Sequence, residues 1–131
     1  MAFLIHSTDD GRVPGIEYLP CAAITPKVGM ALVQSSGNLG IASGTNKPTY
    51  ISMCERETAC TAGDLIPVMR VQPDVIYETT WSVAGTSVKL GSKVTLATSG
   101  LQVTATTESG VAEVVGIVGT AVGEAVRVRF A

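Results

Sequence analysis

Val122-Gly123-Glu124-Ala125-Val126 shows the pattern that decides the fold: an apolar residue, a glycine, two variable residues, and an apolar residue that begins a strand-like run. The same pattern occurs at Val28-Gly29-Met30-Ala31-Leu32, Ala62-Gly63-Asp64-Leu65-Ile66 and Leu90-Gly91-Ser92-Lys93-Val94. Glycine adopts the positive φ angle that a tight turn needs, and alternating apolar residues after it place one face of a strand in a core. The pattern therefore predicts turns that each lead into an inward-facing strand.

The rest of the chain also favours strands and predicts a mainly β fold. Valine and threonine are plentiful, and such β-branched side chains suit a pleated sheet. We expect one domain, a small β-barrel or β-sandwich of about seven to nine short antiparallel strands. Strands are predicted at residues 50–53, 65–71, 75–81, 94–97, 101–105, 111–118 and 126–130.

Two segments need a separate interpretation. Residues 35–48 consist mainly of small residues, including several glycines, and we expect a mobile loop there. At residues 50–53 the strand competes with a short helix that would extend to residue 59, because Ser52 and Glu55 have the spacing of a capping box. The strand is the preferred interpretation.

Residues 1–20 differ from the rest of the chain and are predicted to form an extended N-terminal arm, with residues 21–131 as the β-rich domain. The arm contains turn-forming prolines and glycines and shows no hydrophobic period. Phe3, Leu4 and Ile5 form an apolar trio with no core of their own nearby in the sequence. We therefore expect the arm to be disordered in the free protein and to add as a strand to the sheet edge of a partner.

Charge and hydropathy exclude several classes of function. The net charge is −2, and the arginines and lysines form no basic run, so we expect no nucleic-acid partner. The longest apolar stretch near the C-terminus, residues 111–118, contains Glu113 and is too short to cross a membrane. Charged residues make up only 15% of the chain, against about 25% in an ordinary soluble domain. Part of the surface is therefore expected to be covered by a partner.

We find no catalytic, cofactor-binding or metal-binding pattern in the sequence, and we expect no enzyme. His6 is the only histidine and is expected to be solvated on the arm. Glu55 and Glu57 share one face of an extended segment, which is more typical of a solvated strand face than of paired catalytic carboxylates. Trp81 ends a β run and is expected in the core.

The cysteines and the N-terminus indicate a reducing compartment. Cys21, Cys54 and Cys60 are an odd number, which does not suit a disulfide framework. We expect all three to be ordinary thiols. The first residues lack the basic region of a signal peptide and are soon followed by two aspartates.

Arg127 and Arg129 are the most informative charges. They alternate with three apolar residues in the last predicted strand and so occupy one face of it. This face is either solvated or a subunit contact, because arginine is favoured in polar interfaces and binds carboxylates bidentately. Glu113 on the neighbouring predicted strand is a plausible cross-strand partner in either case.

The run from residue 90 to residue 130, LGSKVTLATSGLQVTATTESGVAEVVGIVGTAVGEAVRVRF, resembles the C-terminal half of the head decoration proteins of tailed bacteriophages, also called capsid cement proteins. The likeness lies in a glycine pattern that opens a strand, a GVA-x-VVGI stretch, and a glycine-acid-x-valine-x-valine ending. The run AGDLIPVMRV at residues 62–71 is similar to an earlier element of that family. Together these runs cover about half of the chain.

The resemblance implies a small β-rich domain on the outside of a DNA-filled phage head, often as a homotrimer. It also implies assembly in the cytoplasm of the host bacterium and a flexible N-terminal segment that engages the major capsid protein. On this hypothesis Phe3, Leu4 and Ile5 are the candidate capsid-binding residues. Arg127 and Arg129 are then the candidates for the subunit interface.

The leading hypothesis is thus a structural virion protein that clamps neighbouring major capsid protein subunits. The alternative is a small β-barrel binding or carrier module of the biotinyl or SH3-like kind, which shares glycine-led hairpins. The carrier form needs a lysine between two methionines at a hairpin tip, and no lysine of this chain has such neighbours. An enzyme is poorly supported by a single histidine without a cluster around it.

Overall fold

The protein is described by a computed structural model that covers residues 2–8, 11 and 13–130, and this part of the chain contains ten β-strands and no helix. The predicted mainly β fold class is confirmed. The strands are β1 (Leu4–Thr8), β2 (Ile16–Pro20), β3 (Ala31–Ser35), β4 (Asn38–Ile41), β5 (Tyr50–Ser52), β6 (Leu65–Arg70), β7 (Val75–Thr80), β8 (Lys93–Val94), β9 (Ala112–Ile117) and β10 (Ala125–Arg129).

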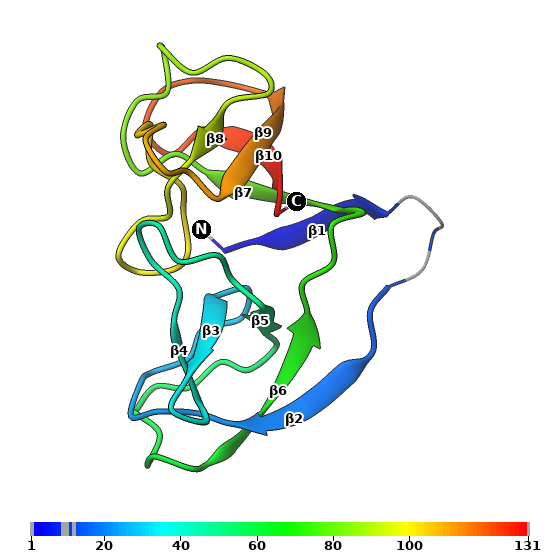
Figure 1. Cartoon of the computed structure of the whole chain (residues 1–131), viewed down its shortest axis with the longest axis vertical. Coiled ribbons are helices and arrows are strands. Elements are labelled where there is room, and N and C mark those ends of the chain that lie inside the picture. Colours follow the sequence, from blue (N-terminus) through cyan, green and yellow to red (C-terminus); the bar gives the residue numbers. More distant parts are fainter. Residues whose placement is uncertain (1, 9–10, 12, 131) are drawn as a thin grey trace.

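The strands form two antiparallel sheets of five strands each, which occupy the upper and lower halves of Figure 1. Sheet A has the order β1-β7-β10-β9-β8, and sheet B has the order β2-β6-β5-β3-β4. The larger core cluster joins the two sheets. Ala31 and Ile51 come from sheet B, and they pack with Tyr77 of sheet A and with Phe3 and Trp81, which flank strands of sheet A. The arrangement is therefore sandwich-like and not a closed barrel.

The four glycine patterns behave as predicted. Gly29, Gly63, Gly91 and Gly123 all have φ angles between 81° and 96°. Each is followed two residues later by a strand, and these strands are β3, β6, β8 and β10. The alternating apolar residues after three of the glycines, Val68, Leu96 and Val128, are all buried. The turns thus depend on glycine, and the strands that follow them bury the predicted face.

The predicted free arm is wrong for the part of residues 1–20 that the structure describes. The segment is extended, but β1 pairs with β7 and β2 pairs with β6 within the chain itself. Phe3 is only 1% exposed, and its ring lies 5.4 Å from the ring of Phe130 in an edge-to-face arrangement. A buried aromatic ring and a paired main chain together hold the segment on the domain. Asp9, Asp10 and Arg12, also assigned to the arm, lie outside the described residues.

Two local predictions change, and the preferred strand at residues 50–53 is confirmed as β5. The expected loop at residues 35–48 contains β4, which forms a hairpin with β3 through the positive-φ pair Ser36 and Gly37, as a two-residue type I′ turn requires. Residues 101–105 form no named strand, although isolated bridges at Val103 and hydrogen bonds such as that from the Thr79 hydroxyl to the Leu101 carbonyl connect them to sheet A. No helix follows Ser52, whose hydroxyl accepts a hydrogen bond from the Cys54 N–H.

The burial of Phe3 gives a direct test of the corrected N-terminus. Replacing Phe3 with alanine leaves a cavity in the shared core, so we expect Phe3→Ala to lower the free energy of unfolding by about 3–5 kcal/mol. Leu4 is its neighbour in the chain but is 48% exposed, and we expect Leu4→Ala to cost less than about 1 kcal/mol. Urea unfolding of both variants measures the difference. Equal stabilities would mean that the N-terminus is a free arm after all.

Gly110 tests the close approach of β8 and β9. A Cβ atom at Gly110 would overlap the main chain of Lys93 and Val94, which has no flexible end to move away. We expect Gly110→Ala to destabilise the fold by about 3 kcal/mol. Gly40→Ala is the matched control, because nothing lies within 4 Å of a Cβ at Gly40. Thermal unfolding followed by circular dichroism distinguishes the two, and similar melting temperatures would refute the steric explanation.

Candidate interaction surface

An apolar groove of about 360 Å³ lies between the two sheets, next to strands β1 and β6. Its wall from sheet A includes Leu4, Ile5 and Tyr77. Its wall from sheet B includes Met69 of β6 and Met53, which directly follows β5. Burial raises the pKa of the Tyr77 hydroxyl to about 12, so this side chain is neutral at physiological pH. The groove is thus an uncharged cleft that both sheets build.

The apolar character continues from the groove onto the outer face of the β2–β6 pair. Ile16 of β2 lies opposite Met69, which lines the groove, and Tyr18 follows Ile16 on the same face. At the far end of the pair, Leu65 lies opposite Pro20 and is also exposed. Ile16, Tyr18 and Leu65 are each 58–65% exposed. We call the groove together with these three side chains the apolar surface.

The apolar surface collects most of the exposed large hydrophobic side chains. The described residues contain eleven of them, and seven belong to this surface. These seven are Leu4, Val13, Ile16, Tyr18, Val28, Met53 and Leu65. Contiguous apolar patches on a small soluble domain mark sites of contact with other molecules. The apolar surface is therefore the first candidate for a binding site.

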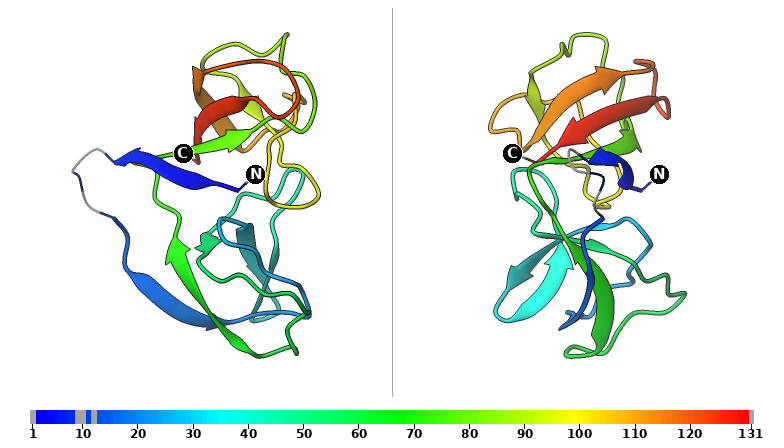
Figure 2. Two further views of the ribbon diagram at one scale, coloured as in Figure 1. Left: turned by 180° about the vertical axis from the view of Figure 1, so that it is seen from behind. Right: turned by 90° about the vertical axis from the view of Figure 1, so that its right-hand side faces the viewer.

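Strands β1 and β2 give this surface a second property. Both are outermost strands, β1 in sheet A and β2 in sheet B. They lie along the same side of the molecule, on the right in Figure 1 and on the left in the left panel of Figure 2. The outer edge of such a strand presents N–H and C=O groups that can pair with another chain. Apolar side chains and main-chain hydrogen-bonding groups thus occur together on one side.

Glu55 is bound to the main chain of Val28, which lines the apolar groove. Its carboxylate accepts a hydrogen bond of 3.0 Å from the N–H of Val28, and it lies 3.3 Å from the amino group of Lys27. The Val28 hydrogen bond, with the adjacent Lys27, holds the pKa of the Glu55 carboxyl below its ordinary value. Glu55 therefore remains ionised and ties the segment after β5 to the glycine turn before β3.

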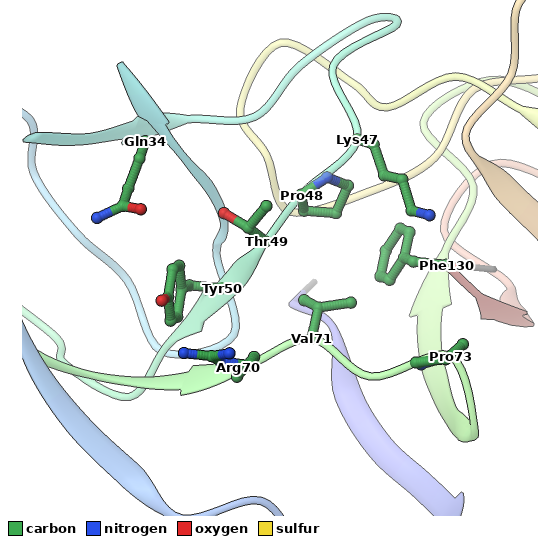
Figure 3. A pocket seen from close by; sticks show the side chains of 9 residues that line it. All are labelled: Gln34, Lys47, Pro48, Thr49, Tyr50, Arg70, Val71, Pro73 and Phe130. Carbon is green, nitrogen blue, oxygen red and sulfur yellow. The ribbon is translucent and has the colours of Figure 1, made fainter. Parts of the chain in front are cut away.

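A second groove, of about 470 Å³, is more polar and is shown in Figure 3. Lys47 and Arg70 stand at different ends of it, and Gln34 and Thr49 line the space between β3 and β6. The Arg70 guanidinium lies 5.8 Å from the ring centre of Tyr50, which holds it in place by a cation–π contact. The same guanidinium lies 3.5 Å from the Glu17 carboxylate, so part of the positive charge at this groove is already balanced within the chain.

Arg127 and Arg129 lie on the outer face of sheet A and already have partners within the chain. The Arg129 Nε donates to Glu113 at 2.6 Å, which confirms the predicted cross-strand partner. The Arg127 Nε donates to Glu78 at 3.1 Å, a partner on β7 that the sequence did not indicate. Both arginines remain partly exposed, so the structure leaves their proposed role in a subunit interface untested.

A charge exchange separates the two interpretations of these arginines. Arg129→Glu alone places two carboxylates opposite each other, and we expect it to lower stability by about 0.5–1 kcal/mol. The double variant Arg129→Glu with Glu113→Arg restores the pair within the chain, and we expect it to recover the wild-type melting temperature and molecular mass. A loss of self-association that persists in the double variant would instead place Arg129 in a subunit contact. Thermal unfolding and light scattering give the two readouts.

The other candidates from the sequence remain apart. His6 and Glu57 are exposed, and Trp81 is fully buried with its indole N–H donating to the Gly119 carbonyl at 2.7 Å.

Among the described residues no group of three or more histidine, cysteine or acidic side chains could hold a metal ion. The same part of the chain contains no helix long and apolar enough to cross a membrane.

Of the three proposed capsid-binding residues, only Leu4 is well exposed. Ile5 is half-buried against the core, and Phe3 is part of it. The apolar surface instead uses Ile16 and Tyr18, which the sequence analysis did not select. Their alternation along residues 16–18 was a usable signal, since it puts two large apolar side chains on one face of a strand.

No protein-family model matches this sequence, and no curated protein matches it. The resemblance to phage head decoration proteins therefore stays a prediction from the quoted runs of sequence.

Proposed function

We propose that the protein is a structural virion protein that binds the outer surface of a bacteriophage head and clamps neighbouring major capsid protein subunits. The observation that carries the proposal is the apolar surface beside the two edge strands β1 and β2. The resemblance of residues 62–71 and 90–130 to decoration proteins supplies the class of partner. The surface supplies a means of holding that partner.

The contact follows from the geometry of β1 and β2. An extended segment of the capsid protein adds to the outer edge of one of these strands through main-chain hydrogen bonds. Its apolar side chains then fill the groove and cover Ile16 and Tyr18, which removes apolar area from water. Because β1 and β2 are already ordered, binding does not carry the entropic cost of folding a disordered arm.

Clamping is a consequence of where the protein binds. A ligand that binds only the assembled shell lowers the free energy of that shell. The gain grows with the logarithm of the ratio between the ligand concentration and its dissociation constant. A protein that bridges two subunits of an expanded shell makes both contacts only on the assembled shell, because a free subunit offers one of them. Many copies on one lattice therefore raise the temperature at which the shell bursts.

The proposed capsid contact is tested with single substitutions on the exposed face of β2. Tyr18→Lys and Ile16→Lys place a charge in the apolar surface without changing the core, so we expect each to weaken binding to expanded, undecorated heads at least about tenfold. Leu90→Lys is the matched control, because Leu90 is 65% exposed but lies outside the apolar surface. Cosedimentation measures binding, and circular dichroism confirms the fold of each variant.

The heads themselves provide the second readout. Wild-type protein should raise the temperature at which DNA-filled heads burst, and the two β2 variants should not. If Tyr18→Lys and Ile16→Lys decorate heads as well as the wild type does, the apolar surface is not the contact. If full decoration leaves the burst temperature unchanged, cementing is the wrong function.

We also propose that the protein forms a homotrimer. The low charge of the chain supports this, as does a second, smaller set of exposed apolar side chains on the loops of sheet A. This set consists of Val83, Val118 and Val122. Light scattering should give three times the chain mass of 13.5 kDa, and a monomer at every concentration would contradict a trimer in solution. Val122→Lys tests this second set, and we expect it to lower the measured mass toward that of one chain.

A further inference from the structure

Two of the three cysteines lie side by side in the core of sheet B. Cys21 directly follows β2, and Cys60 lies in the segment that connects β5 and β6. They are 0% and 3% exposed and belong to the same hydrophobic cluster. After burial, the neighbouring Cys60 side chain is the next cause that raises the pKa of the Cys21 thiol. Thirty-eight residues of sequence separate two thiols that the fold brings into contact.

Main-chain hydrogen bonds fix the relative position of the two segments. The Cys21 N–H donates to the Asp64 carbonyl, and the Gly63 N–H donates to the Cys21 carbonyl, both at 2.8 Å. On the other side, the Cys60 N–H donates to the Ile24 carbonyl, also at 2.8 Å. These bonds hold the two cysteine-bearing segments next to each other, with both thiols in the same buried cluster.

We propose that Cys21 and Cys60 are a disulfide-forming pair that closes when the protein meets a low-molecular-weight disulfide such as oxidised glutathione. One cysteine thiolate attacks the glutathione disulfide, forms a mixed disulfide and releases one reduced glutathione. The second cysteine thiolate then displaces the other glutathione. In total, two protein thiols are oxidised, one glutathione disulfide is reduced, and two reduced glutathione molecules leave.

Burial sets the rate of this reaction. It raises the pKa of the Cys21 thiol to about 12, with the contact to Cys60 as the next cause. Only the thiolate is the nucleophile, so Cys21 reacts slowly while the protein stays folded, and Cys60 is only 3% exposed to a reagent. The reaction is fast only during folding or when the segment around Cys60 opens. The pair is thus a stable crosslink once formed, and not a reactive sensor.

Cys54 provides the internal control. It is only half-buried and lies beside Arg56, whose pKa is raised first of all by its contact with Cys54. It is therefore the thiol that reagents reach most easily. A non-specific oxidation would involve Cys54, whereas the proposed reaction leaves it free and accounts for the odd number of cysteines.

The experiment is refolding of the full chain in a mixture of reduced and oxidised glutathione, followed by alkylation and peptide mass mapping. We expect a product lighter by two hydrogens, with Cys21 joined to Cys60 and with Cys54 alkylated. The bond closes a long loop, so the oxidised protein should melt about 5–10 °C above the reduced one. Cys54→Ser should form the same bond with the same gain, and Cys60→Ser should lose both.

Two results would overturn the proposal. One is a refolded protein with a native circular dichroism spectrum and all three thiols still alkylated. The other is a bond that includes Cys54 in the wild-type chain. Mapping of the wild-type protein decides the matter even if the Cys60→Ser variant does not fold.

Discussion

The packing of Phe3 against the glycine turn before β3 is the contact on which the arrangement of the two sheets depends. The Phe3 N–H donates to the Gly29 carbonyl at 2.9 Å, while the Phe3 ring packs against Phe130 from the last strand. A Cβ at position 29 would collide with Ala2, so glycine is required there for space as well as for its positive φ. One residue at the start of the chain thus joins a turn of sheet B to the core of sheet A.

This contact also explains where the apolar surface lies. Once Phe3 is fixed, β1 must run along the outer edge of β7, and the chain then returns to pair β2 with β6. Both edges therefore come to the same side of the molecule, with the apolar groove beside them. A free arm would have offered one flexible strand, whereas the fold offers two ordered edges with defined side-chain positions.

The parts of the fold that sequence could predict are those set by neighbouring residues. A glycine with positive φ and the alternation after it act within about six residues, and all four patterns led to strands. The pairing of β1 with β7 joins residues about seventy positions apart, and nothing in the run Phe3-Leu4-Ile5 identifies that partner. For the same reason Glu113 could be proposed for Arg129 from a nearby strand, while Glu78 could not be proposed for Arg127. The groove needs both sheets, so no single segment contains a signal for it.

The distribution of charge favours one side of the molecule for binding. On sheet A the outer face carries Glu78, Glu113, Arg127 and Arg129 in two ion pairs. A partner covering that face would have to remove water from four charged groups that already pair with one another. The free-energy penalty of this desolvation exceeds the gain from the new contacts. A partner covering the apolar surface removes water mainly from hydrocarbon groups, and burying such area is favourable. Contact is therefore less favourable on the outer face of sheet A than on the side with β1 and β2.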